Sequence, residues 1–187
     1  MIDIKIDSQD VVEKLKRVEK ALTHRESLMR AIAGIMADAV EENFAREGRP
    51  AWQGLKPGSW LSRAGALTKT GQVSAARLEK KVRGGKILQR SGRLAGSMTE
   101  FSDNDNAGVG TNVKYAAIQN FGGKTKPHEI RPRNKKALAW AGGGHPVGKV
   151  NHPGSNIPAR EFLVLDDSDK QRIETTVEDY LREAVGE

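Results

Sequence analysis

The four histidines of this sequence are the side chains best suited to bind a metal ion. They are His24, His128, His145 and His152, and the last two lie seven residues apart in a segment rich in Gly and Pro. Metal sites usually place ligands at closer spacing on ordered elements, with carboxylate or thiolate support, and this chain has no cysteine. We therefore expect loop histidines that face solvent or phosphate, and neither a metal nor another cofactor.

A serine and an acidic run are the other candidates for catalysis. Ser91 lacks the Gly-x-Ser-x-Gly turn of a nucleophile elbow, and no histidine and carboxylate partners can be assigned to it, so a turn or capping role is favoured. The acidic run from Asp166 to Asp169 directly precedes an amphipathic segment, which favours helix capping over metal binding. The glycines at 108–110 and 142–144 lack the partners of a nucleotide-binding loop and look like hinges. We expect no catalytic residue and no enzymatic activity.

Charge is distributed unevenly along the chain, whose formal net charge is +7. Residues 46–93 carry twelve Lys or Arg against two Asp or Glu, and residues 124–149 carry seven against one. Residues 161–187, in contrast, carry three against nine. This asymmetry would allow the basic middle to bind the acidic part of a second copy, or a polyanion such as DNA. A solvated charged surface without a function is the third alternative.

Two tryptophans in the basic middle, Trp52 and Trp60, could stack on nucleic-acid bases. No further aromatic residues alternate along this segment, as they would on a base-stacking sheet. Packing of the indoles on the core or on a neighbouring subunit is therefore favoured over nucleic-acid binding.

The composition favours a non-secreted protein without a membrane segment. No apolar run approaches the roughly 20 residues of a membrane helix. The first residues alternate between isoleucine and charged side chains, unlike a signal peptide. The absence of cysteine fits a reducing cytoplasm.

Periodicity predicts the elements at both ends of the chain. Ile2, Ile4 and Ile6 alternate as in a half-buried strand. Apolar residues at helical spacing then predict three helices. The first is capped by Asp7 or Ser8, and the second begins with a capping box at Thr23–Glu26 and stops at Gly48 and Pro50. The third is a C-terminal helix capped by Asp166, Asp167 or Ser168. The apolar faces are Val11, Leu15, Val18 and Leu22 for the first helix, and Ile173, Val177, Tyr180, Leu181 and Ala184 for the last.

The middle of the chain predicts shorter elements between long irregular segments. We expect a loop over 48–86 with a short helix at 72–81, followed by a helix at 88–97. Strands at 98–101 and 107–110 should flank the turn 103–106, with a short helix at 112–120 after them. An extended edge at 128–132 and a strand at 138–140 should then precede a mobile arm at about 141–160 and a strand at 161–165. The fold class is α+β: an N-terminal strand and two amphipathic helices, a small mostly antiparallel sheet and a C-terminal helix, with long Gly/Pro-rich basic loops or arms. Residues 1–187 are expected to form a single domain.

An ordered set of short motifs resembles the phage virion morphogenesis (tail-completion) family. The motifs are Gly48-Arg49-Pro50-Ala51-Trp52, Ile87-Leu88-Gln89-Arg90-Ser91-Gly92-Arg93-Leu94, Val109-Gly110-Thr111, Tyr115-Ala116 with Phe121-Gly122-Gly123, and Pro158-Ala159-Arg160-Glu161-Phe162-Leu163. Many members have proline where this chain has Glu161, so the turn before the last strand could differ. The segment from Gly65 to Lys86 is longer than the family pattern suggests.

The resemblance implies a non-enzymatic structural protein of a tailed phage or prophage, which acts in tail completion and head–tail joining. It would work as a ring at the head-proximal end of the tail, with a hexamer as the candidate oligomer. Its partners would be further copies of itself and the tail-tube and head-connector proteins, with possible non-specific contact with DNA and none with a membrane. The protein would occupy the host cytoplasm during assembly and then the tail or neck of the virion. A DNA-binding accessory protein that uses the basic middle is the alternative.

Five basic residues are our candidates for intersubunit or DNA contact: Arg77, Lys80, Lys81, Arg83 and Lys86. Three aromatic residues of the family-like motifs, Tyr115, Phe121 and Phe162, are expected in the core instead.

Overall fold

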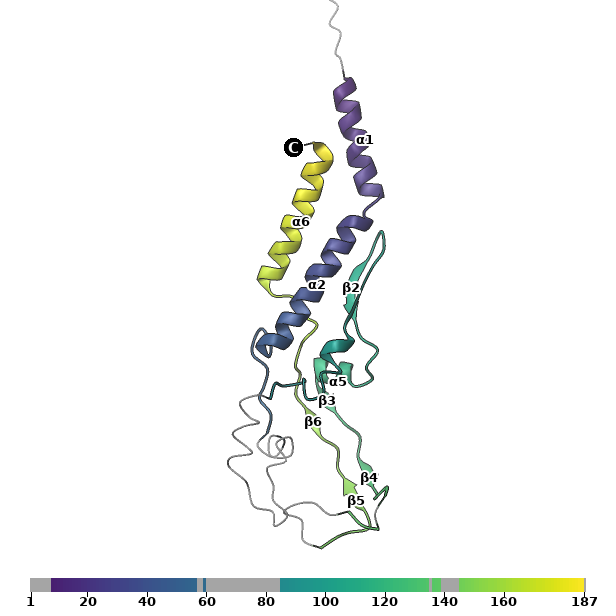
Figure 1. The fold of residues 1–187 in the computed structure, drawn as a ribbon, viewed down its shortest axis with the longest axis vertical. Coiled ribbons are helices and arrows are strands. Elements are labelled where there is room, and N and C mark those ends of the chain that lie inside the picture. Colours follow the sequence, from purple (N-terminus) through teal and green to yellow (C-terminus); the bar gives the residue numbers. More distant parts are fainter. Residues whose placement is uncertain (1–7, 57–58, 60–84, 135, 139–144, 187) are drawn as a thin grey trace, which may run out of the picture. The chain divides into compact units, whose positions relative to one another are not determined.

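The computed structural model describes residues 8–56, 59, 85–134, 136–138 and 145–186 (Figure 1). The chain divides into two compact units, each built from segments that are not consecutive in sequence. Unit 1 comprises Met1–Asn43, Ser97–Thr111 and Leu163–Glu187, and unit 2 comprises Phe44–Gly96 and Asn112–Phe162. The boundary falls inside one helix, so the prediction of a single domain stays a prediction.

Unit 1 contains long helices and one hairpin. The helices are α1 (Gln9–Thr23), α2 (Glu26–Arg46, whose last turn belongs to unit 2) and α6 (Asp167–Val185). Helix α6 lies against α1, and the Tyr180 hydroxyl lies 2.9 Å from the carbonyl oxygens of both Ala21 and His24, where it can donate to either. These three helices follow the apolar spacing of the sequence.

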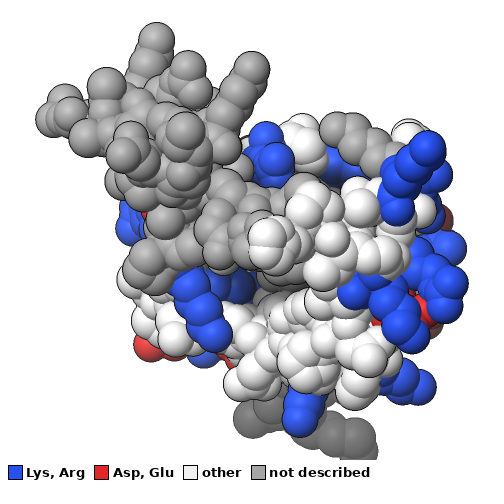
Figure 2. Space-filling view, turned by 90° about the horizontal axis from the view of Figure 1, so that it is seen from below, with Lys and Arg blue, Asp and Glu red and all other residues white. Residues whose placement is uncertain are grey.

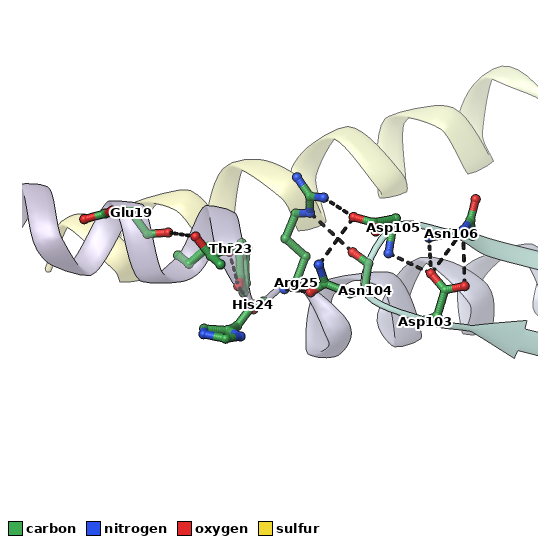
Figure 3. A network of polar contacts seen from close by, with 10 residues as sticks. Glu19, Thr23, His24, Arg25, Asp103, Asn104, Asp105 and Asn106 are labelled. Carbon is green, nitrogen blue, oxygen red and sulfur yellow. Dashed lines mark hydrogen bonds and ion pairs between the residues drawn. The ribbon is translucent and has the colours of Figure 1, made fainter.

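The predicted capping box at the start of α2 is wrong. The Thr23 hydroxyl donates to the carbonyl oxygen of Glu19 at 2.8 Å, so Thr23 ends α1 instead of beginning α2. A side chain distant in sequence takes the capping role, because the Asn104 side-chain oxygen accepts from the backbone N–H of Arg25 at 2.7 Å. The Arg25 guanidinium in turn pairs with Asp105, as Figure 3 shows.

The hairpin that carries Asn104 was predicted correctly. Strands β1 (Thr99–Ser102) and β2 (Ala107–Gly110) are antiparallel, with Thr99 opposite Gly110 and Ser102 opposite Ala107. In the turn between them, one Asp103 carboxylate oxygen accepts from the backbone N–H groups of Asp105 and Asn106, both at 2.7 Å. These bonds lower the pKa of Asp103, that from Asp105 the most.

The capping of α6 also follows the sequence. Asp166 is its N-cap and accepts from the backbone N–H of Asp169, whose carboxylate accepts from the N–H of Asp166. The segment before it was predicted as a strand, and this was wrong. Residues 161–165 form no strand, because side-chain amides rather than a neighbouring strand bind their backbone: Asn43 donates to the Val164 carbonyl oxygen at 2.9 Å.

Unit 2 is built from one short helix and two pairs of short strands. Helix α5 (Ala116–Phe121) precedes β3 (Gly123–Lys124), which pairs with β6 (Asn156–Ile157). Strand β4 (His128–Ile130) pairs with β5 (Val150–His152), and Leu138 forms an isolated bridge with Val147. All pairings in the described part of the chain are antiparallel.

These observations confirm the α+β class, with differences in detail. The strands form three two-stranded sheets rather than one small sheet. The helix expected at 88–97 is wrong, because Leu88 and Gly92 have φ values of 60° and 69°, and only the 3-10 helix η1 (Ala95–Ser97) forms there. Part of the expected arm at 141–160 forms β5 and β6, and its mobility stays a prediction. The strand at Ile2–Ile6, the helix at 72–81 and the end of the strand at 138–140 lie outside the described residues.

Candidate assembly surfaces

An aromatic cluster forms the centre of unit 2. The Phe44 ring stacks on that of Phe162 at a centroid distance of 5.2 Å and meets the Trp52 ring edge-on at 5.7 Å. The Trp52 indole N–H donates to the carbonyl oxygen of Glu161 at 3.1 Å. The prediction that Trp52 packs on the core is therefore confirmed, whereas Trp60 lies outside the described residues.

Buried polar side chains join the family-like motifs to this cluster. Asn120 is 3% exposed, and its side-chain oxygen accepts from the backbone N–H of Phe162 at 3.0 Å. Arg160 is 5% exposed and donates its Nε to the carbonyl oxygen of Gln53 at 3.1 Å. Its backbone N–H donates to the carbonyl oxygen of Gln119 at 2.9 Å. These motifs hold chain segments together, which is a structural role.

Sequence reasoning missed Asn120 and Arg160 because both are polar residue types that are mostly exposed. One signal was present for Asn120. It lies four residues after Ala116 and therefore shares a face of α5 with that apolar residue, and both are buried.

The end of α2 is fixed by backbone geometry and by side-chain donors. Glu47 and Gly48 have φ values of 59° and 101°, which end the helix at the predicted position. The last helical carbonyl groups need partners. The Lys86 Nζ donates to the carbonyl oxygen of Ala45 at 3.1 Å, and the Gln89 amide donates to that of Phe44 at 2.6 Å.

Lys86 is thus the one predicted contact residue that lies in the described part of the chain, and it caps a helix from an exposed position. Arg77, Lys80, Lys81 and Arg83 lie outside the described residues. Contact of these five residues with a neighbouring subunit or with DNA stays a prediction.

Two of the three aromatic residues expected in the core lie at the surface. Phe162 is fully buried, as expected, but Phe121 is 74% exposed and Tyr115 is 43% exposed. On α5, the buried face is formed by Ala116 and Asn120, which turns Phe121 towards solvent. The expectation for Tyr115 and Phe121 was wrong.

A pocket of about 590 Å³ lies beside Tyr115 in unit 2. Its described lining includes the cations of Lys56, Arg90 and Arg160 and no carboxylate. Ser91 also lines the pocket, and its Oγ accepts from the backbone N–H of Arg93 at 3.4 Å. This weak bond fits the turn role predicted for Ser91.

The β4–β5 pair carries an exposed cluster of charged and imidazole side chains. Glu129 forms ion pairs with Lys149 at 2.9 Å and with Arg131 at 2.5 Å, and these contacts, that of Lys149 first, lower its pKa. The rings of His128 and His152 stack across the strands at a centroid distance of 5.1 Å. Among the described residues, no three His, Cys, Asp or Glu side chains are grouped closely enough to hold a metal ion.

The two units differ sharply in charge. The described residues of unit 2 include fourteen Lys or Arg and three Asp or Glu. Those of unit 1 include nine Lys or Arg and seventeen Asp or Glu. Figure 2 shows one face on which many basic side chains and few acidic ones are visible. The fold therefore gathers the charge that the sequence distributes over several segments into one basic and one acidic unit.

Comparison with known proteins identifies the class to which this arrangement belongs. The model of the phage virion morphogenesis family matches residues 6–182. This chain belongs to that family. It is also 34% identical to the Mu-like prophage FluMu G protein 2 of Haemophilus influenzae, over 183 residues that cover 97% of each chain. No solved structure matches the chain.

Membership of the family gives the protein a role in the morphogenesis of a phage or prophage virion. It fits the structural character of the buried motifs described above. None of the helices in the described part of the chain is both long and apolar enough to cross a lipid bilayer.

Proposed function

We propose that this protein completes the tail of a phage or prophage virion and joins it to the head, as a non-enzymatic ring at the head-proximal end of the tail. Its partners are further copies of itself, in a ring of six that would match the sixfold symmetry of a tail, and the tail-tube and head-connector proteins. It acts in the host cytoplasm during assembly and stays in the tail or neck of the virion.

The division of charge between the two units is the observation that carries this proposal. The acidic unit 1 of one copy can bind the basic unit 2 of the next copy. Such a contact joins two different surfaces, and a head-to-tail contact of this kind generates a closed ring when its rotation closes. The family membership supports the setting of a virion.

A DNA-binding accessory protein is the alternative, and the basic character of unit 2 favours it specifically. A unit whose described residues include fourteen cations, of which Arg160 is buried, against three anions would bind the phosphate backbone without sequence preference. The same surface cannot bind a neighbouring subunit and DNA at once, so the two functions predict different results for a protein free of nucleic acid.

The experiment that tests the proposal is a pair of charge reversals, with solution mass measured by light scattering. One variant carries Glu174→Lys and Glu178→Lys on α6, and the other carries Lys124→Glu in β3 and Lys126→Glu two residues after it. All four positions are exposed. Each variant alone should lose assembly, because like charges then meet at the interface. An equimolar mixture should regain it, because each reversed surface finds its complement on the other variant.

Two controls separate the alternatives. Assembly of the wild-type protein through this contact should weaken from about 0.05 M to about 0.5 M salt, since exposed charges are screened. The alternative would replace the ring proposal if both charge-reversed variants kept the solution mass of the wild type and the wild type bound generic DNA with a steep salt dependence.

A further inference from the structure

Helix α1 presents large apolar side chains to solvent. Leu15 is 63% exposed, Val11 57% and Leu22 50%. In addition, Val12 on the same helix is 43% exposed, and α1 contributes no buried residue. Four large apolar side chains exposed on a helix of 15 residues indicate a surface that a partner covers.

Val11, Leu15, Val18 and Leu22 form an apolar stripe along α1, and this stripe is not the face that contacts α6. The contact with α6 is made around Arg17, Ala21 and His24, which lie near Tyr180 and Gly186. At 100° per residue, the stripe of Val11, Leu15, Val18 and Leu22 lies roughly 110° around the helix from that face. Val18, at the side of the stripe nearer to α6, is accordingly half-buried while the others are exposed. Helix α6 therefore cannot cover the stripe.

The spacing of the stripe fits another helix. Its positions are separated by four, three and four residues, which is the alternation of d and a positions in a heptad repeat. With Val11 and Val18 at d and Leu15 and Leu22 at a, Lys14 occupies a g position and Glu19 the following e position. In a parallel coiled coil, the g residue of one helix lies beside the next e residue of its neighbour. Lys14 of one copy would then meet Glu19 of the next.

We propose that the α1 helices of several copies of this chain associate in parallel through this stripe, as a coiled-coil bundle. The charge complementarity of Lys14 and Glu19 is what points to a second copy as the occupant, because one helix supplies both members of the pair. Leucine at a with a β-branched residue at d disfavours two strands and favours bundles of three or more. The apolar Val12 at an e position widens the apolar contact, which also favours bundles of three or more helices.

This interface is separate from the charged contact of the proposed function, and it holds whether or not that contact forms. Apolar burial depends little on salt, whereas the contact between the acidic and basic units weakens as salt increases. Measurements at about 0.5 M salt therefore report mainly on the contact through α1.

The first test compares Leu15→Glu with the control Lys16→Glu at about 0.5 M salt. Both residues are exposed on α1, but Lys16 lies outside the stripe. Light scattering should show the mass of Leu15→Glu falling to that of one chain, 20.4 kDa, while wild type and Lys16→Glu keep a multiple of it. Circular dichroism should show equal helix content for all three. A wild-type mass of one chain in high salt would overturn the inference and leave the charged ring untouched.

The second test determines the partner and its direction. The chain has no cysteine, so Leu22→Cys introduces a single thiol near the end of the stripe. A parallel bundle brings the introduced thiols of neighbouring copies within disulfide distance, whereas antiparallel packing would instead cross-link a mixture of Val11→Cys and Leu22→Cys. At about 0.05 M salt, where exposed charges are less screened, Lys14→Glu and Glu19→Lys should each weaken association, and the double variant should regain it. Cross-linking of the mixture only, or a double variant as weak as the singles, would overturn the parallel arrangement.

Discussion

Buried side-chain amides fix the irregular parts of this protein. Asn120 binds the backbone N–H of Phe162, and Asn43 binds the carbonyl oxygen of Val164, on a segment that no strand pairs with. Both asparagines are almost fully buried. A buried backbone group must find a partner, and an amide side chain supplies one where the chain path excludes a neighbouring strand. The family-like segment that contains Phe162 therefore contributes to the core.

Gly122 allows the turn between α5 and β3. Its φ is 71°, and a Cβ atom there would lie 2.7 Å from the backbone nitrogen of Ala159. We expect Gly122→Ala to lower the free energy of unfolding by about 1–3 kcal/mol or more, because the backbone strain and the clash with Ala159 add together. Urea unfolding would measure the loss. Gly148→Ala is the matched control, because its Cβ would have no heavy atom of the described part within 4 Å. Equal stability of both variants would contradict the argument.

The carboxylate of Glu129 should titrate below its ordinary pKa. Lys149 and Arg131 favour its charged form. Because the pKa is lower in the folded state, the stabilisation is present above the unfolded pKa and is lost as pH falls through the folded pKa. NMR titration of the side-chain carboxyl should show the pKa rising in Lys149→Ala and unchanged in Lys124→Ala. A Glu129 pKa that does not respond to removal of Lys149 would contradict the ion pair.

At the scale of elements, local signals in the sequence explain most of what was predicted correctly. Helical spacing located α1, α2 and α6, and the Asp-rich turn located the β1–β2 hairpin. Two of the failures depend on information that the local sequence does not carry. Thr23 matched a capping pattern, but Asn104 of the hairpin binds the amide at the start of α2. The positive φ of Leu88, which prevents the helix expected there, has no signature in residue type.

The N-terminus of α6 offers a test at this scale. The Asp166 carboxylate accepts from the backbone N–H of Asp169, and the Asp169 carboxylate accepts from the backbone N–H of Asp166. Replacing Asp166 by alanine should lower the free energy of unfolding by about 0.5–2 kcal/mol, the usual effect of losing an N-cap. Glu174→Ala, at an exposed position in the middle of the same helix, should change it by less than about 0.5 kcal/mol. Thermal unfolding followed by circular dichroism would compare the two, and equal losses would argue against the cap.

At the scale of the whole molecule, the sequence predicted the charge asymmetry but not its division between two units. Unit 1 combines the ends of the chain with the β1–β2 hairpin, and unit 2 combines the segments between them. Composition alone reveals basic and acidic stretches, whereas long-range pairing decides which stretches share a unit. The predicted contact residues illustrate the limit: choosing the densest basic run gave Arg77–Lys86, although cations are distributed throughout unit 2.

The two proposed contacts between copies should have separable effects on the association of this protein. The contact between acidic and basic units is electrostatic and should weaken with salt. The contact through α1 is apolar and should weaken on cooling, because hydrophobic stabilisation decreases at low temperature. We therefore expect Leu15→Glu to retain an association that salt removes, and the charge-reversed α6 variant to retain an association that cooling removes.

Sedimentation velocity, measured over a range of salt concentrations and a range of temperatures, would separate these effects. Combining Leu15→Glu with Glu174→Lys and Glu178→Lys should give a monomer under all conditions, and the losses from the two sites should be close to additive, since they concern different surfaces. If one variant alone abolished both the salt-sensitive and the temperature-sensitive association, the two contacts would be a single interface. The acidic α6 surface and the apolar stripe of α1 would then have to bind the same neighbour, in one contact made by unit 1.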